Sequence, residues 1–295
     1  MSQSILLIGS NGQVGTELQR ILTPYRNTVA VARPTIDMTK PDTLRSIIRE
    51  NKPQIIINAA AYTAVDKAES EVEAAMAVNG IAPGILAEEA ERFGASLIHI
   101  STDYVFDGNN SRPYLETDTI NPLSVYGKTK LRGEEAIQKF CTNYFILRTA
   151  WVYGSFGKSN FVKTMLRLGG EREELRVVSD QIGSPTWARD IADAIAQILP
   201  QLRPEMTGIY HYTNSGVASW YDFAVTIFEE AQQLGFPLKV QRVVPISTSE
   251  YPTLARRPSY SVLSCAKITK VLGTYPPQWR QSLRQMIKEW LVVSV

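Results

Sequence analysis

A glycine-rich turn between a short apolar strand and a helix constrains the fold of this chain more than any other feature. Residues 4–8 have the pattern of a buried strand, and apolar residues recur at helical spacing from residue 14 to residue 22. The turn between them contains Gly9, Asn11, Gly12, Gln13, Val14 and Gly15. Glycines at these places permit a tight turn, a close approach of the backbone to a pyrophosphate, and close packing of the helix on the strand.

This turn predicts a dinucleotide-binding site, because the N-terminus of the helix that follows attracts phosphate charge. The spacing is G-x-x-G-x-x-G, which departs from the commoner G-x-G-x-x-G, and a plain glycine turn is the alternative. The position of the glycines between a strand and a helix favours the dinucleotide site.

Strands and helices alternate along the rest of the chain. Apolar runs predict strands near residues 28–32, 55–57, 95–101, 144–149 and 208–213, with helical patterns between them. This alternation predicts an α/β fold with a Rossmann-type, doubly wound parallel sheet. We expect residues 1–155 to form the dinucleotide-binding domain, joined by a returning strand near 207–215. Residues 156–295 are expected to form mainly a smaller, interleaved α/β lobe that binds the substrate.

The residues that follow the second and third strands indicate the type of cofactor. Arg33 lies where an NAD-specific site usually carries an acidic residue, and an arginine suits a 2′-phosphate. The sequence therefore favours NADPH, with NADH as the second choice and a solvated charge as the other interpretation of Arg33. Asp37 and Met38 are placed to flank the adenine. Small residues after the third strand would let a flat cofactor approach the backbone, or would serve core packing, and this run includes Ala60, Ala61, Tyr62 and Thr63.

Two short motifs supply candidate catalytic groups. Thr102 and Asp103 emerge at the carboxyl end of a predicted strand, where open parallel sheets bind ligands. Tyr126 and Lys130 are four residues apart in a helix predicted over 125–140, so they share one face. An ammonium group lowers the pKa of a neighbouring phenol, so we expect Tyr126 to exchange a proton with a substrate oxygen. An ordinary surface pair is the alternative for Tyr-x-x-x-Lys.

The composition excludes several classes of partner. The 295 residues carry a net charge of +2, which gives no argument for nucleic acid or an anionic membrane as a partner. Cys141 and Cys265 lack the spacing of a zinc site. The longest apolar stretch is too short to span a bilayer, and residues 1–3 lead directly into a strand without room for a signal peptide. We therefore expect a cytoplasmic protein with a small-molecule substrate.

Four motifs together resemble the extended short-chain dehydrogenases/reductases, namely the glycine triplet, the run 58–61, Ser101-Thr102-Asp103 and Tyr126-x-x-x-Lys130. Within that superfamily, the chain resembles the dTDP-4-dehydrorhamnose reductases at residues 12–15, 63–69, 101–106, 126–130, 180–186 and 251–258. The resemblance covers essentially the whole chain. It implies a nucleotide-sugar substrate and an NAD(P)H-dependent reduction of the 4-keto group of dTDP-4-dehydro-6-deoxy-L-mannose. The product would be dTDP-L-rhamnose, a precursor of cell-surface polysaccharide.

The resemblance also implies roles for the catalytic groups. Tyr126 would donate a proton to the oxyanion that forms at the sugar, and Lys130 would lower the pKa of Tyr126 and bind the nicotinamide ribose. Thr102 would orient the keto oxygen and assist the proton transfer. The backbone at residues 12–14, 37–38 and 61–63 matches cofactor contacts in the family.

Three further residues match substrate-contacting positions in the resemblance. Asp103 and Trp151 correspond to contacts with the sugar nucleotide, and the indole offers a flat face to the sugar or base. Arg257 is a candidate partner of the nucleotide diphosphate, because a guanidinium forks onto phosphate oxygens. Arg256 beside it is the alternative for that role.

Related activities and one binding role are the competing interpretations. Sugar-nucleotide 4,6-dehydratases resemble this chain but carry Asp-Glu where it has Asp103-Tyr104, and tyrosine does not supply their second carboxylate. A 4-epimerase shares the Tyr/Lys pair. The regulatory subunit of methionine adenosyltransferase also resembles these reductases, yet it acts as an NADP-binding partner and not as an enzyme. Retention of Thr102, Tyr126 and Lys130 together favours catalysis.

Magnesium is the remaining question for a cofactor. Some members of the family are described as dimers bridged by magnesium through glutamates, and Glu17 and Glu289 fall at two such positions. The third position holds Arg189, whose cation would repel Mg²⁺. We therefore predict no metal bridge of this kind, and expect a monomer or a homodimer.

Overall fold

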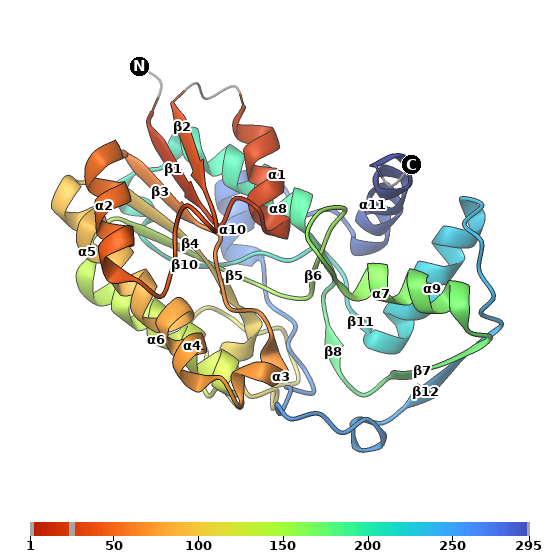
Figure 1. Cartoon of the computed structure of the whole chain (residues 1–295). Coiled ribbons are helices and arrows are strands. Elements are labelled where there is room, and N and C mark those ends of the chain that lie inside the picture. The colour runs from red at the N-terminus through yellow and green to blue at the C-terminus, as the bar shows by residue number, and fades with distance from the viewer. Residues whose placement is uncertain (1–2, 24–26, 294–295) are drawn as a thin grey trace.

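A six-stranded parallel sheet forms the centre of the larger part of the molecule in the computed structural model (Figure 1). The structure describes residues 3–23 and 27–293, so Met1 and Ser2, which entered the prediction on location, lie outside it. The strand order is β10-β5-β4-β3-β1-β2, and every pair in this sheet is parallel. The strands are β1 (Ile5–Ile8), β2 (Thr28–Val31), β3 (Ile55–Asn58), β4 (Ser96–Thr102), β5 (Tyr144–Thr149) and β10 (Gly208–His211). The predicted Rossmann-type sheet is thus confirmed.

Helices cover both faces of this sheet and bury its apolar side chains. One face packs on α1 (Gln13–Leu22), α8 (Ala188–Ile198) and α10 (Ala266–Leu272). The other face packs on α2 (Pro41–Asn51), α5 (Ala82–Phe93) and α6 (Val125–Phe140). Central strands such as β1 and β3 are buried along their whole length, as parallel strands between two helical layers must be.

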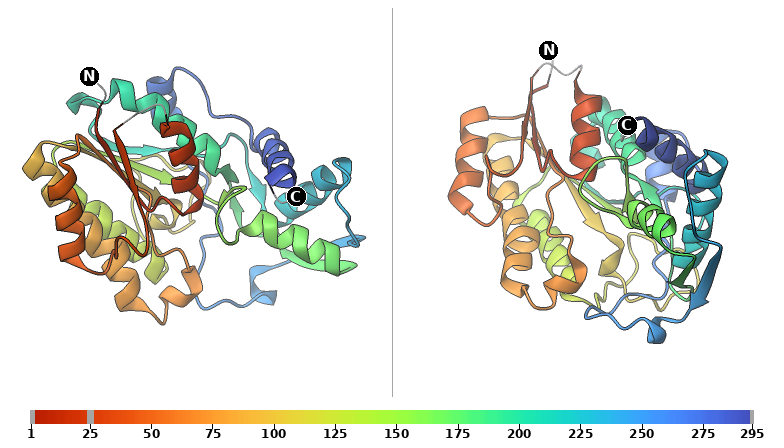
Figure 2. Two further views of the ribbon diagram at one scale, coloured as in Figure 1. Left: turned by 45° about the horizontal axis from the view of Figure 1, so that its top comes forward. Right: turned by 45° about the vertical axis from the view of Figure 1, so that its right-hand side comes forward.

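A second core lies beside the sheet and is built by helices from the later part of the chain. It contains α7 (Phe161–Glu171), α9 (Trp220–Gln233) and α11 (Trp279–Val293), which gather on one side of the molecule (Figure 2). The parallel pair β7 (Glu174–Val178) and β12 (Arg242–Ile246) borders it and was not among the predicted strands. The domain limits 1–155 and 156–295 stay a prediction. No helix in the described ranges is long and apolar enough to cross a membrane.

Residues 72–93, within the helical pattern that separates the predicted strands at 55–57 and 95–101, form three consecutive helical pieces. These are α4 (Val72–Met76), a π-helical turn at Ala77–Ile81, and α5. Asn79 at the centre of the π turn is buried, and its side chain binds another part of the backbone. Insertions of this kind are often found at functional sites, which makes Asn79 a candidate site residue.

Candidate active site

The glycine turn has the geometry that its sequence predicts. Gly9 adopts φ +85°, and a Cβ there would lie 2.5 Å from the backbone nitrogen of Ala60. A Cβ on Gly15 would lie 2.0 Å from the carbonyl oxygen of Gly9, so only glycine lets α1 pack this closely. Helix α1 begins at Gln13 without a capping side chain. Its first N–H groups can therefore bind a phosphate, which fits a dinucleotide.

The side chains of the turn differ in what they can offer a cofactor. Asn11 is exposed, whereas Val14 is buried in the core, so Val14 can contribute only its backbone. The Gln13 side chain accepts a hydrogen bond from Asn160 Nδ2 at 2.9 Å and lies 3.5 Å from the carbonyl oxygen of Val152. Gln13 thereby ties the glycine turn to the chain that follows β5.

Arg33 and Asp37 lie close together beyond the carboxyl end of β2. Arg33 is exposed. Asp37 accepts hydrogen bonds from Thr39, which lower its pKa, and the charge of Arg33 acts in the same direction. Met38 is buried and its side chain packs in the core beneath the site. Their roles towards a cofactor stay predictions.

Asn79 holds the run that follows β3. Its Oδ1 accepts from the Tyr62 backbone nitrogen at 2.8 Å, and its Nδ2 donates to the Tyr62 carbonyl oxygen at 3.0 Å. The Tyr62 hydroxyl donates to Glu71, Ala60 and Ala61 are partly buried, and Thr63 is exposed. The sequence analysis did not assign a role to Asn79. Its only local signal was an Asn-Gly pair, a poor helix former, inside a helical stretch.

Tyr126 and Thr102 meet at the carboxyl edge of the sheet. Thr102 ends β4, and Tyr126 lies in the first turn of α6, which the Ser124 hydroxyl caps by accepting from Gly127. Burial raises the pKa of Tyr126 to about 12, and a hydrogen bond with the Thr102 side chain opposes this shift. The expected lowering of the Tyr126 pKa is therefore wrong for this state, because loss of hydration and the charge of Asp103 outweigh the hydrogen bond with Thr102.

Lys130 is buried behind this pair and points at β4. Its Nζ donates to the carbonyl oxygen of Ile100 at 2.6 Å and lies 3.4 Å from His99 Nε2. Burial lowers the pKa of Lys130 to about 8, against the opposing charge of Glu134. Lys130 is therefore held by the strand that carries Thr102.

A chain of polar contacts behind Lys130 fixes the tautomer of His99. The backbone nitrogen of Ala60 donates to Asn58 Oδ1, so Asn58 Nδ2 faces His99 Nδ1 at 3.0 Å and donates to it. A neutral His99 then carries its proton on Nε2, which faces Lys130. An N–H aimed at the lysine nitrogen disfavours the ammonium form. The sequence analysis gave His99 no role, although a histidine within an otherwise apolar strand indicates a buried polar contact.

Asp103 and Tyr104 complete the edge beside Tyr126. Burial raises the pKa of Asp103 to about 7, while the hydroxyls of Ser261 and Thr102 act in the opposite direction. The rings of Tyr104 and Tyr126 meet edge to face, with centroids 5.6 Å apart. A carboxyl group that is half protonated near neutrality thus lies next to the candidate acid.

Trp151 is held in an uncommon backbone conformation with φ +47°. Its ring stacks on Trp220 with a centroid distance of 3.5 Å, and a Cβ on Gly183 would lie 2.5 Å from the indole. The stack covers one face of the indole, so a substrate can meet only the uncovered part. Positive φ in a bulky residue costs energy and persists where neighbours impose it, as they do here.

Gly183→Ala is expected to displace the Trp151 indole, because the new methyl group would overlap the ring. We expect a loss of about 1–3 kcal/mol in the free energy of unfolding and a severalfold rise in KM for the substrate. Urea denaturation and steady-state kinetics measure these effects. Gly170→Ala is the matched control, because its Cβ would meet only an ordinary contact at 3.6 Å. Equal behaviour of the two variants would refute the assigned role of Gly183.

Arg257 is paired with Asp66 of α3 (Val65–Ala68). The closest contact joins Arg257 Nη2 to Asp66 Oδ2 at 2.6 Å, and Nη1 lies 3.1 Å from Oδ1. Burial opposes the charge of Arg257, but its hydrogen bond to Asp66 raises its pKa, and Tyr104 contributes in the same direction. Arg257 thus lies near Tyr104, whose ring contacts Tyr126.

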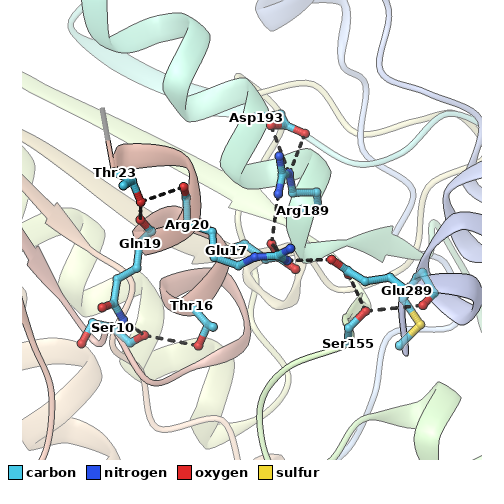
Figure 3. A network of polar contacts seen from close by, with 11 residues as sticks. Ser10, Thr16, Glu17, Gln19, Arg20, Thr23, Ser155, Arg189, Asp193 and Glu289 are labelled. Carbon is cyan, nitrogen blue, oxygen red and sulfur yellow. Dashed lines mark hydrogen bonds and ion pairs between the residues drawn. The ribbon is translucent and has the colours of Figure 1, made fainter. Parts of the chain in front are cut away.

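Glu17 and Glu289 are both paired with arginine. Figure 3 shows that Arg20 Nη1 reaches both carboxylates, at 3.0 Å from Glu17 and 2.7 Å from Glu289. Arg189 lies 3.7 Å from Glu17, and the Ser155 hydroxyl donates to Glu289. No group of three metal-binding side chains occurs within residues 3–23 and 27–293. Guanidinium groups take the place that a cation would need, so these residues do not fit Mg²⁺.

We expect magnesium to leave the assembly of this protein unchanged. Adding Mg²⁺ or chelating it should not change the mass measured by light scattering, because Arg20 and Arg189 already neutralise the two glutamates. A mass that rises with Mg²⁺ and falls with chelator would contradict the prediction. Arg189→Glu, which restores a carboxylate, is the variant in which a response to Mg²⁺ is expected.

The sequence model of the RmlD substrate binding domain family matches residues 3–292. The chain belongs to this family. It is 45% identical over 292 residues to the dTDP-4-dehydrorhamnose reductase of Escherichia coli K12, covering 97% of each chain. It is 41% identical to the spore coat polysaccharide biosynthesis protein SpsK of Bacillus subtilis, again covering 97% of each. The predicted family is confirmed.

Solved structures of the family share the fold. The dTDP-4-dehydrorhamnose reductase of Bacillus anthracis in complex with NADP has a TM-score of 0.91 and 38% identity, covering 98% of this chain and 100% of that one. The UDP-glucose 4-epimerase of Thermotoga maritima reaches a TM-score of 0.79 at 18% identity, which shows a common fold alone.

Proposed function

We propose that this chain catalyses the reduction of dTDP-4-dehydro-6-deoxy-L-mannose to dTDP-L-rhamnose with NAD(P)H. The proposal rests on Thr102, Tyr126 and Lys130 gathered at the carboxyl edge of the sheet, in a family whose relatives carry the name dTDP-4-dehydrorhamnose reductase. A cytoplasmic location and a monomeric or homodimeric state are further predictions that accompany this function.

Reduction of a ketone needs a proton donor, and burial keeps the Tyr126 hydroxyl protonated at cellular pH. NADPH held at the glycine turn would supply the hydride that converts the C4 carbonyl of the sugar into an alkoxide. The Tyr126 hydroxyl then gives its proton to that oxygen, and its raised pKa keeps this proton available. Thr102 is placed beside Tyr126 to orient the keto oxygen. Lys130 would bind the nicotinamide ribose and favour the phenolate that remains.

The glycine turn, Arg33 and the run at Ala60, Ala61, Tyr62 and Thr63 would hold the cofactor. The uncapped start of α1 fits the pyrophosphate, and the exposed guanidinium of Arg33 suits a 2′-phosphate. We therefore propose NADPH as the preferred cofactor, with NADH also accepted.

Arg33→Ala is expected to raise KM for NADPH by about tenfold and to leave KM for NADH nearly unchanged. The reason is that a guanidinium binds the 2′-phosphate, which NADH lacks. Steady-state kinetics with both cofactors measure the change. Lys52→Ala serves as a control for loss of a positive charge at the opposite end of the sheet, after α2. A parallel rise in both KM values would argue against a 2′-phosphate contact.

Turnover of the sugar nucleotide tests the function itself. The 4-keto substrate, generated in place by the preceding dehydratase and epimerase reactions, is mixed with protein and NADPH, and oxidation of NADPH and formation of dTDP-L-rhamnose are followed. Stoichiometric conversion supports the reductase. Tight cofactor binding without turnover would instead favour the partner-binding role seen in the regulatory subunit of methionine adenosyltransferase.

A further inference from the structure

The short helix α3 joins two parts of the site through one carboxylate. Asp66 accepts hydrogen bonds from Arg257 Nη1 and Nη2, and also from the backbone nitrogen of Ala255 at 3.1 Å. In Figure 1 the blue segment that carries Arg257 runs close to α3. Because one of the three donors is a backbone N–H, Asp66 fixes the position of this segment as well as the charge of Arg257.

A second carboxylate, in the residue that directly follows α3, binds the start of the catalytic helix. Glu69 Oε1 accepts from the backbone nitrogen of Val125 at 2.8 Å, and Val125 is the first residue of α6. This N–H has no partner within the helix, and a negative charge is favourable at a helix N-terminus. Tyr126 is the next residue, so Glu69 acts beside the proposed acid.

Arg257 keeps donors available after these contacts. Its Nη1 also donates to Thr253 Oγ1 at 2.6 Å and to the Ala255 carbonyl oxygen at 3.2 Å. These bonds and those to Asp66 use the Nη1/Nη2 end of the guanidinium. The Tyr104 hydroxyl also forms a hydrogen bond with Arg257. The remaining edge, formed by Nε and the second N–H of Nη2, has the bidentate geometry that arginine offers to phosphate, so an anion that binds there would compete with Tyr104.

We propose that Asp66 is a positioning residue for the sugar nucleotide. It holds Arg257 beside Tyr104 and Tyr126 so that the Nε/Nη2 edge of the guanidinium meets the diphosphate. Glu69, three residues further on, fixes the end of α6 that carries Tyr126. One short helix thus sets the distance between the diphosphate contact and the acid. This inference rests on the proposed function, because it takes a nucleoside diphosphate as the ligand.

Binding of dTDP tests the positioning role without any turnover. Calorimetry in the presence of NADP⁺ would compare wild type, Asp66→Asn and the control Lys67→Gln, which removes an exposed charge from the same helix. We expect Asp66→Asn to weaken dTDP binding by about tenfold or more, and Lys67→Gln to stay within about twofold. Unchanged NADP⁺ affinity and melting temperature would exclude misfolding as the cause. Equal or tighter dTDP binding by Asp66→Asn would overturn the proposal, because Asp66 would then compete for Arg257.

Kinetics separate the two carboxylates. Asp66→Asn should raise KM for the sugar nucleotide with kcat close to wild type, whereas Glu69→Gln should lower kcat with a smaller change in KM. Asp66→Glu should recover part of the dTDP affinity, because it keeps the charge. If both variants change KM and kcat in the same proportion, the division of roles is wrong. If the wild type binds dTDP but turns over no keto sugar, the proposed function is wrong. The dTDP affinity of Asp66→Asn still tests the positioning role of Asp66 in that case.

Discussion

Replacing Tyr126 by phenylalanine is expected to lower kcat by about a hundredfold to ten-thousandfold, the usual range for loss of a positioned acid. Only the hydroxyl is lost, so the edge-to-face contact with Tyr104 and the affinity for NADPH should remain. NADPH oxidation gives kcat, and quenching of protein fluorescence gives cofactor affinity. Tyr144→Phe is the control, because this tyrosine begins β5 at the opposite edge of the sheet.

A Tyr126→Phe variant that kept more than about a tenth of the wild-type rate would show that another group supplies the proton. Asp103 is the residue to examine in that event. Its buried carboxyl, with a pKa of about 7, can hold a proton near neutrality, and it lies beside Thr102. Asp103→Asn would then remove the remaining activity.

Arg148→Met is expected to lower the free energy of unfolding by about 3–5 kcal/mol, the cost of leaving one charge of a buried ion pair without its partner. Arg148 and Glu134 are both fully buried, and their closest contact is 2.6 Å. Ser101 also donates to Glu134. Glu134 lies one turn beyond Lys130 on α6, so we expect part of the activity to be lost as well. Urea denaturation measures the stability.

The exposed pair Arg167–Glu171 provides the control for this prediction. It has the same ion types at 3.1 Å, but the two side chains are 61% and 52% exposed. Arg167→Met should therefore cost less than about 0.5 kcal/mol. Adding Glu134→Leu to Arg148→Met should recover part of the loss, because no isolated charge is then buried. Similar losses in the two arginine variants would mean that Glu134 is neutral or hydrated in the core.

Local patterns predicted the sheet and the helices that carry the site. The bounds of α6 followed from the turn before it and from its helical spacing, and they agree with the structure at both ends. The strands β7 and β12 were missed because each carries charged residues or proline at exposed positions, which interrupt the apolar run. Their pairing is a long-range contact that no local pattern reports.

The candidate site was predictable as a set of residues but not as a set of contacts. Thr102 and Tyr126 were paired through their motifs, whereas the contacts of Lys130 with His99 and of Tyr62 with Asn79 join distant parts of the chain. The Tyr126 pKa was misjudged for the same reason. A four-residue spacing reveals the neighbouring charge, but burial depends on the whole fold.

The π turn at Ala77–Ile81 limits the position of α6. One extra residue in a helix rotates the side chains that follow it by about 100° about the helix axis. The side chains of α4 and α5 therefore point to different sides, although the two helices are continuous. The turn brings the carbonyl oxygen of Asn79 against α6, where a Cβ on Gly133 would lie only 2.2 Å away. The two backbones are in direct contact, so α6 cannot move closer to the π turn. This contact fixes the distance between α6, which carries Tyr126 and Lys130, and the segment at Tyr62 that Asn79 binds.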